Sequence, residues 1–333
     1  MLNKKNITLM LIIFMLVFSF GNSVQSADMN LKVAHVCNPD HPYHKGLLEF
    51  KEVVEKNSDI KVEIYPSGQL GGSEREYVES LQMGTLDMCL ACTAPLTGFS
   101  ESFMVLDLPF LFKNREHAYE VLDGKIGQEI LDTLEDETIK GLSYFEVGFR
   151  NFTNNKRPIN KPEDLKGLKF RLMETPVHLK SVREWGGIPT PMAIGEVFTA
   201  LQQGTIDGQE NPLPIIDTFN FFEVQDYLSI THHFYSATPL LIQKNIWDNY
   251  NQKQKEVLME AAQAGAEVCR QKNQEKNEVL LDKFKEAGMK VNYANQKAFF
   301  EASQPVYEHF KKELNEEWIN KIIEIGEKYE REF

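Results

Sequence analysis

Two arginines near the middle of the chain are the residues whose type and spacing best suit ligand chemistry. Arg150 follows an extended segment predicted over residues 139–149, and Arg171 lies in a strand predicted over residues 168–173. Alternation along that strand places Arg171 on the face opposite Phe170, away from the core side. If the two strands are neighbours, the guanidinium groups converge and offer planar, permanently charged donors that suit a carboxylate. Ordinary surface salt bridges are the alternative role for both side chains.

Further polar side chains could complete such a site. Asn211 precedes Pro212, which confines it to extended backbone and could help to aim its amide, although a structural turn also explains it. Glu74 lies in the first turn of a predicted helix, where it could accept hydrogen bonds from ligand hydroxyl groups or simply face the helix dipole. His35, near the end of the first strand, is a candidate for the rim of a cleft or a core histidine, and His233 is a further candidate.

Nothing in the sequence reads as a catalytic or metal-binding constellation. Nucleophile-elbow, zinc-protease, P-loop and dinucleotide-binding motifs are all missing from it. His41 and His44 could offer two imidazoles to a metal ion, but a helix that begins with Pro42 explains this sequence pattern more simply. His232 and His233 would face opposite ways on an extended segment and could not share one ion. We therefore predict no catalytic residue, no metal and no cofactor.

The cysteines give no clear redox or zinc site. There are four of them, at positions 37, 89, 92 and 269. Cys89 and Cys92 spell C-x-x-C, which occurs in redox pairs and in zinc sites. The segment around them reads as a strand, on which the two residues would point to opposite faces about 10 Å apart, too far for a disulfide. We predict buried free thiols.

The elements that must position these residues alternate between strands and helices, which indicates an α/β fold. Strands are predicted over 31–37, 60–65, 139–149 and 168–173 and from 86 onward, helices over 41–56, 73–84, 177–185, 252–287 and most of 296–333, and a helical turn over 162–165. Ser73 and Glu76 have the spacing of a capping box at the start of one helix.

An internal echo suggests two similar lobes. Residues 81–87 and 201–207 each contain a helix end, a glycine suited to a left-handed cap and a strand start, although chance could produce so short an echo. Residues 252–287 contain no proline and are followed by Gly288. They predict one helix about 54 Å long, which we expect to cross both lobes.

The N-terminus indicates export. Lys4 and Lys5 precede an apolar run over residues 7–20, after which small and polar residues follow. This is the layout of a secretory signal peptide, and the run is shorter than the roughly 20 apolar residues of a membrane anchor. We predict a signal peptide over residues 1–26 and a periplasmic mature protein.

The overall charge excludes some partners. The formal net charge is −13, and it becomes −15 without the first 26 residues. Nucleic acids and anionic lipids select clustered Lys and Arg, so we expect neither as a partner. An anionic ligand would have to be held by local cations against the overall field.

Three phrases together resemble the extracytoplasmic receptors of tripartite ATP-independent periplasmic (TRAP) transporters. They are P-E-D-L-K-G-L-K-F-R over 162–171, P-M-A-I-G-E-V over 191–197 and D-G-Q-E-N-P over 207–212, and the resemblance extends from Leu31 through the long helix. It implies a two-lobed periplasmic-binding-protein-like fold, in which each lobe is a sheet flanked by helices and the cleft between them closes on an organic acid. It also implies delivery of that acid to the membrane subunits of an ion-gradient-driven TRAP permease.

The resemblance also assigns roles to individual residues. The principal carboxylate-binding arginine of the family corresponds to Arg171, its second arginine to Arg150 and its cleft asparagine to Asn211. Further ligand contacts are implied around Glu74 and Thr93.

The ligand hypothesis that follows is a hydroxylated monocarboxylate, with a hexuronate such as glucuronate or galacturonate as the best guess. The sialic-acid-binding branch of the family has an acidic and a basic side chain where this chain has Cys92 and Pro95, which speaks against sialic acid. A C4-dicarboxylate would need a further cation that the sequence does not place. A C4-dicarboxylate, a 2-oxoacid or another sugar acid remains an alternative.

Two other functions stay open at this point. A secreted sugar-acid lyase or isomerase of the same build would need a general base, for which only His35 or Glu74 is available. A receptor for an ATP-driven transporter would differ mainly in its partner. We expect a monomer, with lobe I over residues 27–148 plus about 236–275, and lobe II over 149–235 plus about 276–333.

Overall fold

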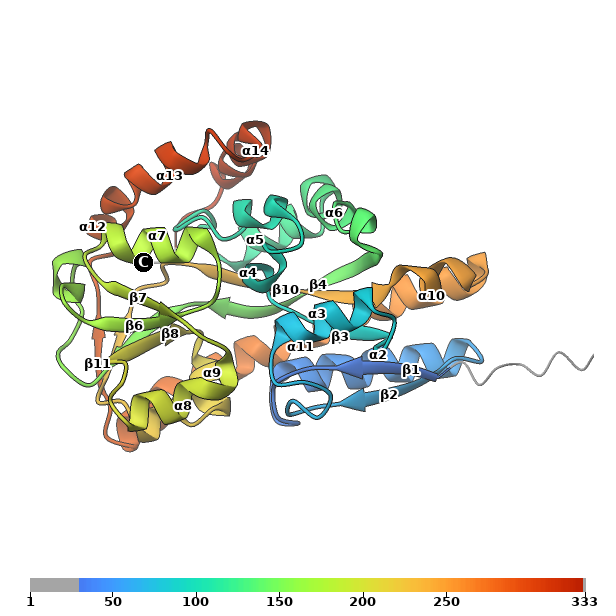
Figure 1. Ribbon diagram of the computed structural model, residues 1–333, viewed down its shortest axis with the longest axis horizontal. Coiled ribbons are helices and arrows are strands. Elements are labelled where there is room, and N and C mark those ends of the chain that lie inside the picture. Colours follow the sequence, from blue (N-terminus) through green and yellow to red (C-terminus); the bar gives the residue numbers. More distant parts are fainter. Residues whose placement is uncertain (1–29, 332–333) are drawn as a thin grey trace, which may run out of the picture.

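A computed structural model describes residues 30–331, which form two β-sheets flanked by helices (Figure 1). The predicted signal peptide lies outside the described residues. Within the described part of the chain, no helix combines the length and the apolar character that crossing a bilayer requires. The predicted α/β architecture with two sheets and a long helix is confirmed.

The first sheet has five strands in the order β2-β1-β3-β10-β4. These strands are β1 Asn30–Ala34, β2 Lys61–Tyr65, β3 Met88–Leu90, β4 Ile139–Phe149 and β10 Tyr235–Gln243. β1 pairs in parallel with β2 and β3, whereas β10 runs antiparallel to β3 and β4. Every residue of β10 is buried, as expected for an apolar strand covered on both faces.

The second sheet has six strands in the order β11-β9-β5-β8-β6-β7. They are β5 Asn151–Asn154, β6 Lys169–Leu172, β7 Ile188–Pro191, β8 Gly208–Asn211, β9 Tyr227–Ile230 and β11 Lys290–Tyr293. β5 is antiparallel to both β8 and β9, and β6 is parallel to both β7 and β8. β4 leads from the first sheet into β5 through Arg150, so this arginine lies at a junction between the sheets.

Helices cover both sheets (Figure 1). They are α2 Pro42–Asn57, α3 Glu74–Gln82, α4 Thr93–Leu96, α5 Arg115–Leu122, α6 Lys125–Asp132, α7 Pro176–Glu184, α8 Ile194–Gln202, α9 Leu213–Thr218, α10 Lys244–Asn249, α11 Gln252–Glu286, α12 Gln296–Ala302, α13 Gln304–Phe310 and α14 Glu316–Gly326. α2 begins at Pro42, and Nδ1 of His41 accepts a hydrogen bond from the backbone N–H of Tyr43 at 3.1 Å. The interpretation of this histidine segment as a helix start is therefore confirmed.

The long helix α11 binds the two halves of the molecule together. It begins with a capping box between Asn251 and Gln254 and is followed by Gly288, whose φ of 101° ends the helix in the left-handed region. It packs against α2 and β4 on one side and against α9 and β11 on the other. A Cβ atom on Gly265 would lie 2.7 Å from the carbonyl oxygen of Gly46 in α2, so only glycine permits this close approach.

Most predicted elements agree with the structure within a few residues. β4 and the helical turn at Pro162–Leu165 have the predicted bounds. Both glycines of the internal echo, Gly84 and Gly204, have positive φ values of 71° and 67°. The four cysteines are free and buried, as predicted, but the reason was partly wrong. β3 ends at Leu90, so Cys92 is not on the strand and instead precedes α4.

The predicted lobe boundaries stay predictions. The C-terminal helices, which the prediction grouped with lobe II, contact elements of both sheets. α13 packs against α7, which flanks the second sheet. α14, which the prediction grouped with lobe II, packs against α5, and its Ile319 and Ile322 belong to the same apolar cluster as Leu241 of β10. The C-terminal segment therefore extends back over the first sheet.

Candidate functional site

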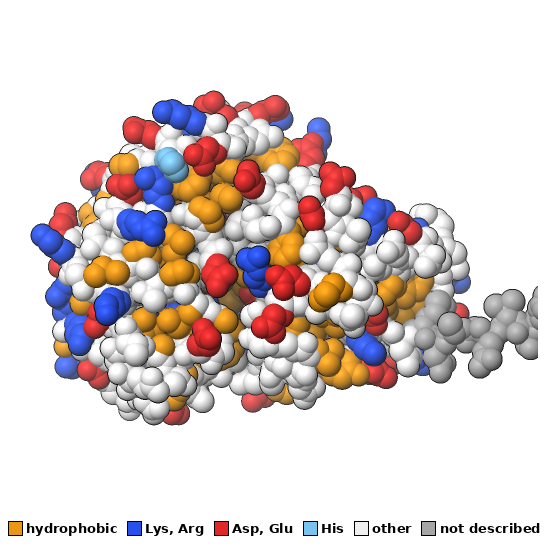
Figure 2. Space-filling view, viewed as in Figure 1, with side chains coloured by type: hydrophobic (Ala, Val, Ile, Leu, Met, Phe, Trp, Pro, Cys, Tyr) orange, Lys and Arg blue, Asp and Glu red, His pale blue; other side chains and the backbone are white. Residues whose placement is uncertain are grey.

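A cavity between the two sheets brings together side chains from both. The empty space between its lining residues is about 790 Å³, which includes space open to solvent. Figure 2 shows a hollow near the centre of one face, with charged side chains of both signs around it. The lining residues are Val36, Cys37, Tyr43, Ser73, Glu74, Arg75, Cys92, Pro95, Val147, Arg150, Arg171, Met173, Glu174, Met192, Ala193, Ile194, Asn211, Ile215 and Phe219.

Arg171 presents an unpaired donor to this cavity. Alternation along β6 buries Phe170 in the core of the second sheet and turns Arg171 to the other face, as predicted. Its Nε donates to the carbonyl oxygen of Met192 at 2.9 Å, which fixes the plane of the guanidinium. Its Nη1 is buried and has no hydrogen-bond partner among the described residues. Burial, together with the charge of Arg150, lowers the pKa of Arg171 to about 10, so the group stays charged at neutral pH.

Arg150, by contrast, is saturated by protein groups. Its Nε donates to Oε2 of Glu210 at 2.5 Å, and its Nη2 donates to Oε1 of Glu210 at 2.8 Å and to Oδ1 of Asn211 at 2.9 Å. Its Nη1 donates to the Ser236 hydroxyl at 3.0 Å. The charge of Arg150 is thus balanced by a buried carboxylate that the sequence reasoning did not single out.

Glu210 is held in its charged form by its neighbours. Burial acts to raise the pKa of Glu210, but the Arg150 guanidinium and the hydrogen bond from His233 outweigh it, and the pKa lies well below its usual range. His233 Nε2 is 3.2 Å from Glu210 Oε2, and its Nδ1 is 2.7 Å from the Thr231 hydroxyl. An acid inside the fully buried strand β8 is a sequence signal that could have suggested a cationic partner.

Asn211 ends β8 and links Arg150 to the rest of the sheet. Its Oδ1 accepts from Arg150, and its Nδ2 donates to Oε1 of Gln209 at 2.6 Å, which leaves one amide hydrogen for the cavity. Pro212 then begins the turn into α9, whose N-cap it forms. The expectation that Pro212 holds Asn211 in extended backbone agrees with its position on the strand.

Glu74 faces both arginines from the opposite side of the cavity. It is the first residue of α3, whose N-cap is Ser73. Burial raises the pKa of Glu74, and hydrogen bonding to Cys92 and the charges of Arg171 and Arg150 act in the opposite direction. Glu74 therefore adds a polar acceptor that lies within the electrostatic reach of both guanidinium groups.

The predicted route by which the arginines converge requires correction. The predicted strand over residues 139–149 is β4 of the first sheet, whereas β6 belongs to the second sheet, so the two strands are not neighbours. The two side chains still line one cavity, because Arg150 precedes β5 at the sheet junction and reaches across the end of β8, where Glu210 and Asn211 bind it.

Three of the predicted site residues lie outside the set that lines the cavity. His35 is fully buried, with its Nε2 3.1 Å from Nδ1 of His44, and its neighbours Val36 and Cys37 take the cavity positions. His233 lies behind Glu210, as described above. His232 has a φ of 46°, in the left-handed region, so the backbone here is not the extended stretch assumed in the sequence argument.

Thr93, the third of these residues, belongs to a separate buried cluster. Its hydroxyl donates to Oδ1 of Asp107 at 2.6 Å. Asp107 is 1% exposed, and burial raises its pKa to about 7, against the hydrogen bond from Thr93; the Thr175 hydroxyl is also near, but neither it nor Asp107 Oδ2 has a hydrogen-bond partner among the described residues. Thr175 precedes α7, so this carboxyl lies where the second-sheet segment meets the first.

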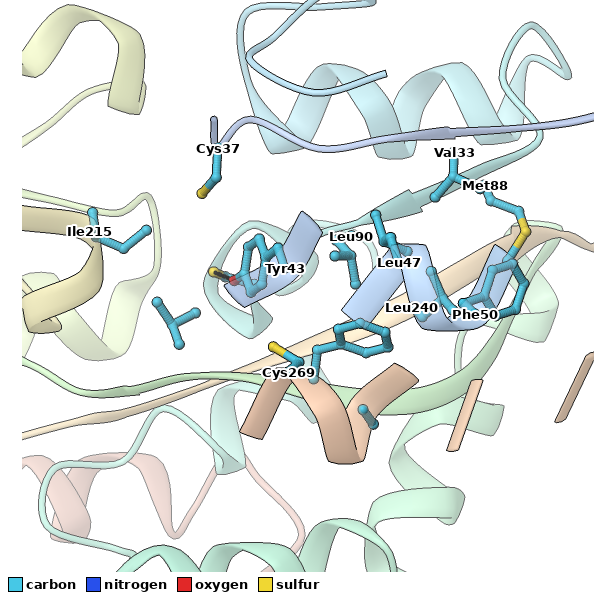
Figure 3. Close-up of a cluster of buried hydrophobic side chains, with 14 of the residues drawn as sticks. Val33, Cys37, Tyr43, Leu47, Phe50, Met88, Leu90, Ile215, Leu240 and Cys269 are labelled. Atoms are coloured by element: carbon cyan, nitrogen blue, oxygen red, sulfur yellow. Dashed lines mark hydrogen bonds between the residues drawn. The ribbon is translucent and has the colours of Figure 1, made fainter. Parts of the chain in front are cut away.

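Apolar side chains form much of the remaining wall. Tyr43, Cys37 and Ile215 approach the same region from different elements in Figure 3. They belong to one continuous apolar cluster that also contains Val147 and Met173 and extends into both sheets. The cavity thus has charged side chains at one end, and most of its remaining wall is apolar.

A contact between the two halves lies at the cavity. Arg75 of α3 and Glu174, which follows β6, both line it, and their Nη1 and Oε2 atoms are 3.9 Å apart. Both side chains are about half exposed, so this pair contributes little to stability. It shows that the two halves approach each other at this point of the cavity.

Comparisons with known proteins agree with this geometry. The chain matches the profile of the family described as bacterial extracellular solute-binding protein, family 7, over residues 33–313. A solved structure of a TRAP periplasmic solute binding protein from Polaromonas sp JS666, bound to D-erythronate, is 40% identical and has a TM-score of 0.86, with 88% of this chain and 98% of that chain covered.

Two further solved TRAP periplasmic solute binding proteins carry other acids. One, from Bordetella bronchispeptica with density assigned as pantoate, is 37% identical, covers 88% of this chain and 98% of its own, and has a TM-score of 0.86. The other, from Anaerococcus prevotii with bound D-glucuronate, is 29% identical, covers 91% and 99%, and has a TM-score of 0.87.

Proposed function

Because the chain belongs to the family 7 bacterial extracellular solute-binding proteins, which serve TRAP transporters, we propose that it captures a small organic monocarboxylate in the periplasm and delivers it to TRAP permease subunits. The observation that carries this proposal is the Nη1 of Arg171, a buried cationic donor in the cavity between the sheets that is unpaired within residues 30–331. A carboxylate oxygen is the partner that such a donor requires.

The charges around the cavity favour one carboxylate over two. Glu210 neutralises Arg150, and Arg75 is half exposed beside Glu79 and Glu174, which leaves Arg171 as the buried cation available to a ligand in the described part of the chain. A second carboxylate would meet Glu74 within reach of the same arginines. C4-dicarboxylates are therefore poorer candidates for this chain than monocarboxylates.

The chemical identity of the acid is a more specific question. The hexuronate hypothesis from the sequence has support in the D-glucuronate-bound relative, while the two relatives of higher identity were solved with D-erythronate and with density assigned as pantoate. All of these acids have a single carboxylate together with hydroxyl groups. We therefore propose a hydroxylated monocarboxylate as the ligand class.

The proposed mechanism is closure of the cleft around the ligand. Arg171 and Glu74 come from different halves, so a ligand that touches both stabilises the closed state by contacts that the open state lacks. One Arg–carboxylate pair contributes about 1.5–3 kcal/mol, whereas micromolar affinity needs about 8 kcal/mol. Contacts with the rest of the ligand must supply the difference.

The experiment that tests this function is a thermal-shift screen of the mature protein with organic acids, neutral sugars and amino acids, repeated with Arg171→Ala. Ligand at 100 times its dissociation constant stabilises the folded state by about 2.7 kcal/mol. We expect a shift with a monocarboxylate that Arg171→Ala abolishes. If no carboxylate raises the unfolding temperature, or if the shift persists in Arg171→Ala, the proposal is contradicted.

Two assays separate the alternative functions. An NMR assay should find the bound acid chemically unchanged, whereas turnover would favour a lyase or isomerase; His35, one of its two possible bases, does not line the cavity. Genes for a small and a large membrane subunit beside this gene, without an ATPase, would support a TRAP permease as the partner over an ATP-driven transporter.

A further inference from the structure

Most polar groups that line the cavity are already bonded within the protein. All three side-chain nitrogens of Arg150 donate to protein oxygens. The Tyr43 hydroxyl lies 2.5 Å from Oγ1 of Thr238, and the Ser73 hydroxyl accepts from the backbone N–H of Glu76 at 3.2 Å as an N-cap. Arg150 and Tyr43 therefore have little remaining capacity for a ligand, whereas the Ser73 hydroxyl keeps its proton as a donor.

The groups that remain are few and gather at one end. Among the buried groups of the described residues they are the unpaired Nη1 of Arg171, the second hydrogen of the Asn211 amide and the Glu74 carboxylate, while the half-exposed Arg75 and Glu174 add further charged groups to the lining. Glu74 interacts with the charges of both arginines, and Asn211 is bonded to Arg150. This set suits a carboxylate and one or two hydroxyl groups close to it.

Beyond that end the wall is mostly carbon and sulfur, and it comes from both halves of the molecule. The apolar lining residues include Val36, Pro95, Val147, Met173, Met192, Ile194, Ile215 and Phe219. Val147, Met173 and Ile215 are buried members of one apolar cluster, against which Ile194 and Phe219 pack. Figure 3 shows Ile215 on the α9 side of this region, across from Tyr43 of α2.

We propose that the cavity selects a short, branched acid, with a hydroxyl group next to the carboxylate and an aliphatic remainder against Ile215 and Val147. This inference rests on the proposed function and narrows its ligand class. Each methyl or methylene group that leaves water for the apolar wall increases affinity about fourfold. A hydroxyl group placed there loses its water without gaining a partner, which weakens binding. A hexuronate, with hydroxyl groups around its ring, therefore binds less tightly than the branched acid.

The test is isothermal titration of the mature protein with three acids of graded polarity. They are pantoate (2,4-dihydroxy-3,3-dimethylbutanoate), D-erythronate and D-glucuronate. We expect pantoate to bind at least tenfold more tightly than D-erythronate, because two methyl groups of pantoate meet the wall, and D-glucuronate to bind more weakly than both. D-Glucuronate binding as tightly as pantoate, or more tightly, overturns the inference.

Two variants at Ile215 separate the effect of side-chain polarity from the effect of side-chain volume. The side chains in Ile215→Val and Ile215→Thr have nearly the same shape, but the first has a methyl group where the second has a hydroxyl group. Ile215→Val should keep the order of the three acids, with pantoate affinity within about fourfold of the unchanged protein. Ile215→Thr should lower pantoate affinity at least tenfold and change D-erythronate affinity less than threefold. Equal effects of both variants on all three acids would overturn the assignment of this wall.

The outcomes also distinguish this inference from the proposed function. Tight binding of D-glucuronate that Arg171→Ala abolishes keeps the function and overturns the inference. Failure of every carboxylate to bind contradicts the function itself. Thermal unfolding of each variant without ligand, with the same midpoint as the unchanged protein, shows that the comparison is made between folded proteins.

Discussion

Arg150 and Glu210 form a buried ion pair with two contacts, Nε to Oε2 at 2.5 Å and Nη2 to Oε1 at 2.8 Å, and their side chains are 1% and 0% exposed. Arg171 has no such compensation at Nη1, which is buried without a partner among residues 30–331. The two arginines therefore differ in role. Arg150 belongs to the scaffold of the site, and Arg171 carries the charge that a ligand can neutralise.

Removing Arg171 should affect binding much more than folding. We expect Arg171→Ala to weaken binding of the acid about 10- to 150-fold, because a charge-assisted hydrogen bond of about 1.5–3 kcal/mol is lost. The unliganded protein should keep its unfolding midpoint within a few degrees, since burial already disfavours the charged group and lowers its pKa to about 10. Calorimetric titration and thermal unfolding measure the two effects. Lys169→Ala, at an exposed position of the same strand, is the control and should change neither.

Removing Arg150, by contrast, should affect folding much more than binding. Arg150→Met leaves the Glu210 charge buried and unpaired, which typically costs about 3–5 kcal/mol. The double variant Arg150→Met/Glu210→Gln removes both charges and should recover at least half of that loss in urea unfolding. A double variant no more stable than the single one would show that the pair is not the source of the effect.

Glu74 should discriminate against a second negative charge. Glu74→Gln keeps the shape of the side chain and removes the repulsion, so we expect succinate to bind at least tenfold more tightly to this variant than to the unchanged protein. Glu76→Gln, two residues along α3, is the matched control. Unchanged succinate affinity in Glu74→Gln would mean that another feature excludes dicarboxylates.

Asp107 should make stability depend on pH. The folded state retains the Asp107 proton up to a pKa of about 7, whereas the unfolded chain releases it near 3.8. Between these values the folded state binds more protons, so the contribution of this carboxyl to stability is full below about pH 4 and is lost as the pH rises to about 7. Each unit of pKa difference corresponds to about 1.4 kcal/mol, which predicts an effect of a few kcal/mol.

Asp107→Asn isolates this effect, because the amide does not titrate. We expect unfolding in urea to show the unchanged protein losing stability relative to Asp107→Asn across pH 4 to 7. Parallel stability curves for the two proteins would contradict the assignment.

Gly265 should be required for the contact between α11 and α2. A Cβ atom there would lie 2.7 Å from the Gly46 carbonyl oxygen, so Gly265→Ala must push the helices apart, at a cost of about 1–3 kcal/mol. Gly72→Ala, where a Cβ would meet only ordinary contacts at 3.8 Å, is the control. Equal unfolding midpoints for the two variants would show that the helices tolerate the added methyl group.

Local patterns in the sequence determined many of the elements. The apolar run of β4, the capping residues of α3 and the glycine after α11 are short-range features, and each predicted its element within a few residues. Alternation also placed Arg171 on the correct face of β6. Local patterns succeed here because propensity and capping depend on neighbours along the chain.

Only the tertiary structure decided how the site is assembled. β8 lies between β5 and β6, so Glu210 and Asn211 meet Arg150 across a strand pairing that no local pattern specifies. The same packing leaves His35 and His233 outside the cavity lining and brings Ile215 and Val147 into it. Sequence reasoning identified Arg150, Arg171 and Glu74 as charged candidates, but it did not single out Glu210, which neutralises Arg150. Which apolar residues line the cavity depends on how the two sheets pack against each other, and their strands come from segments far apart in the sequence.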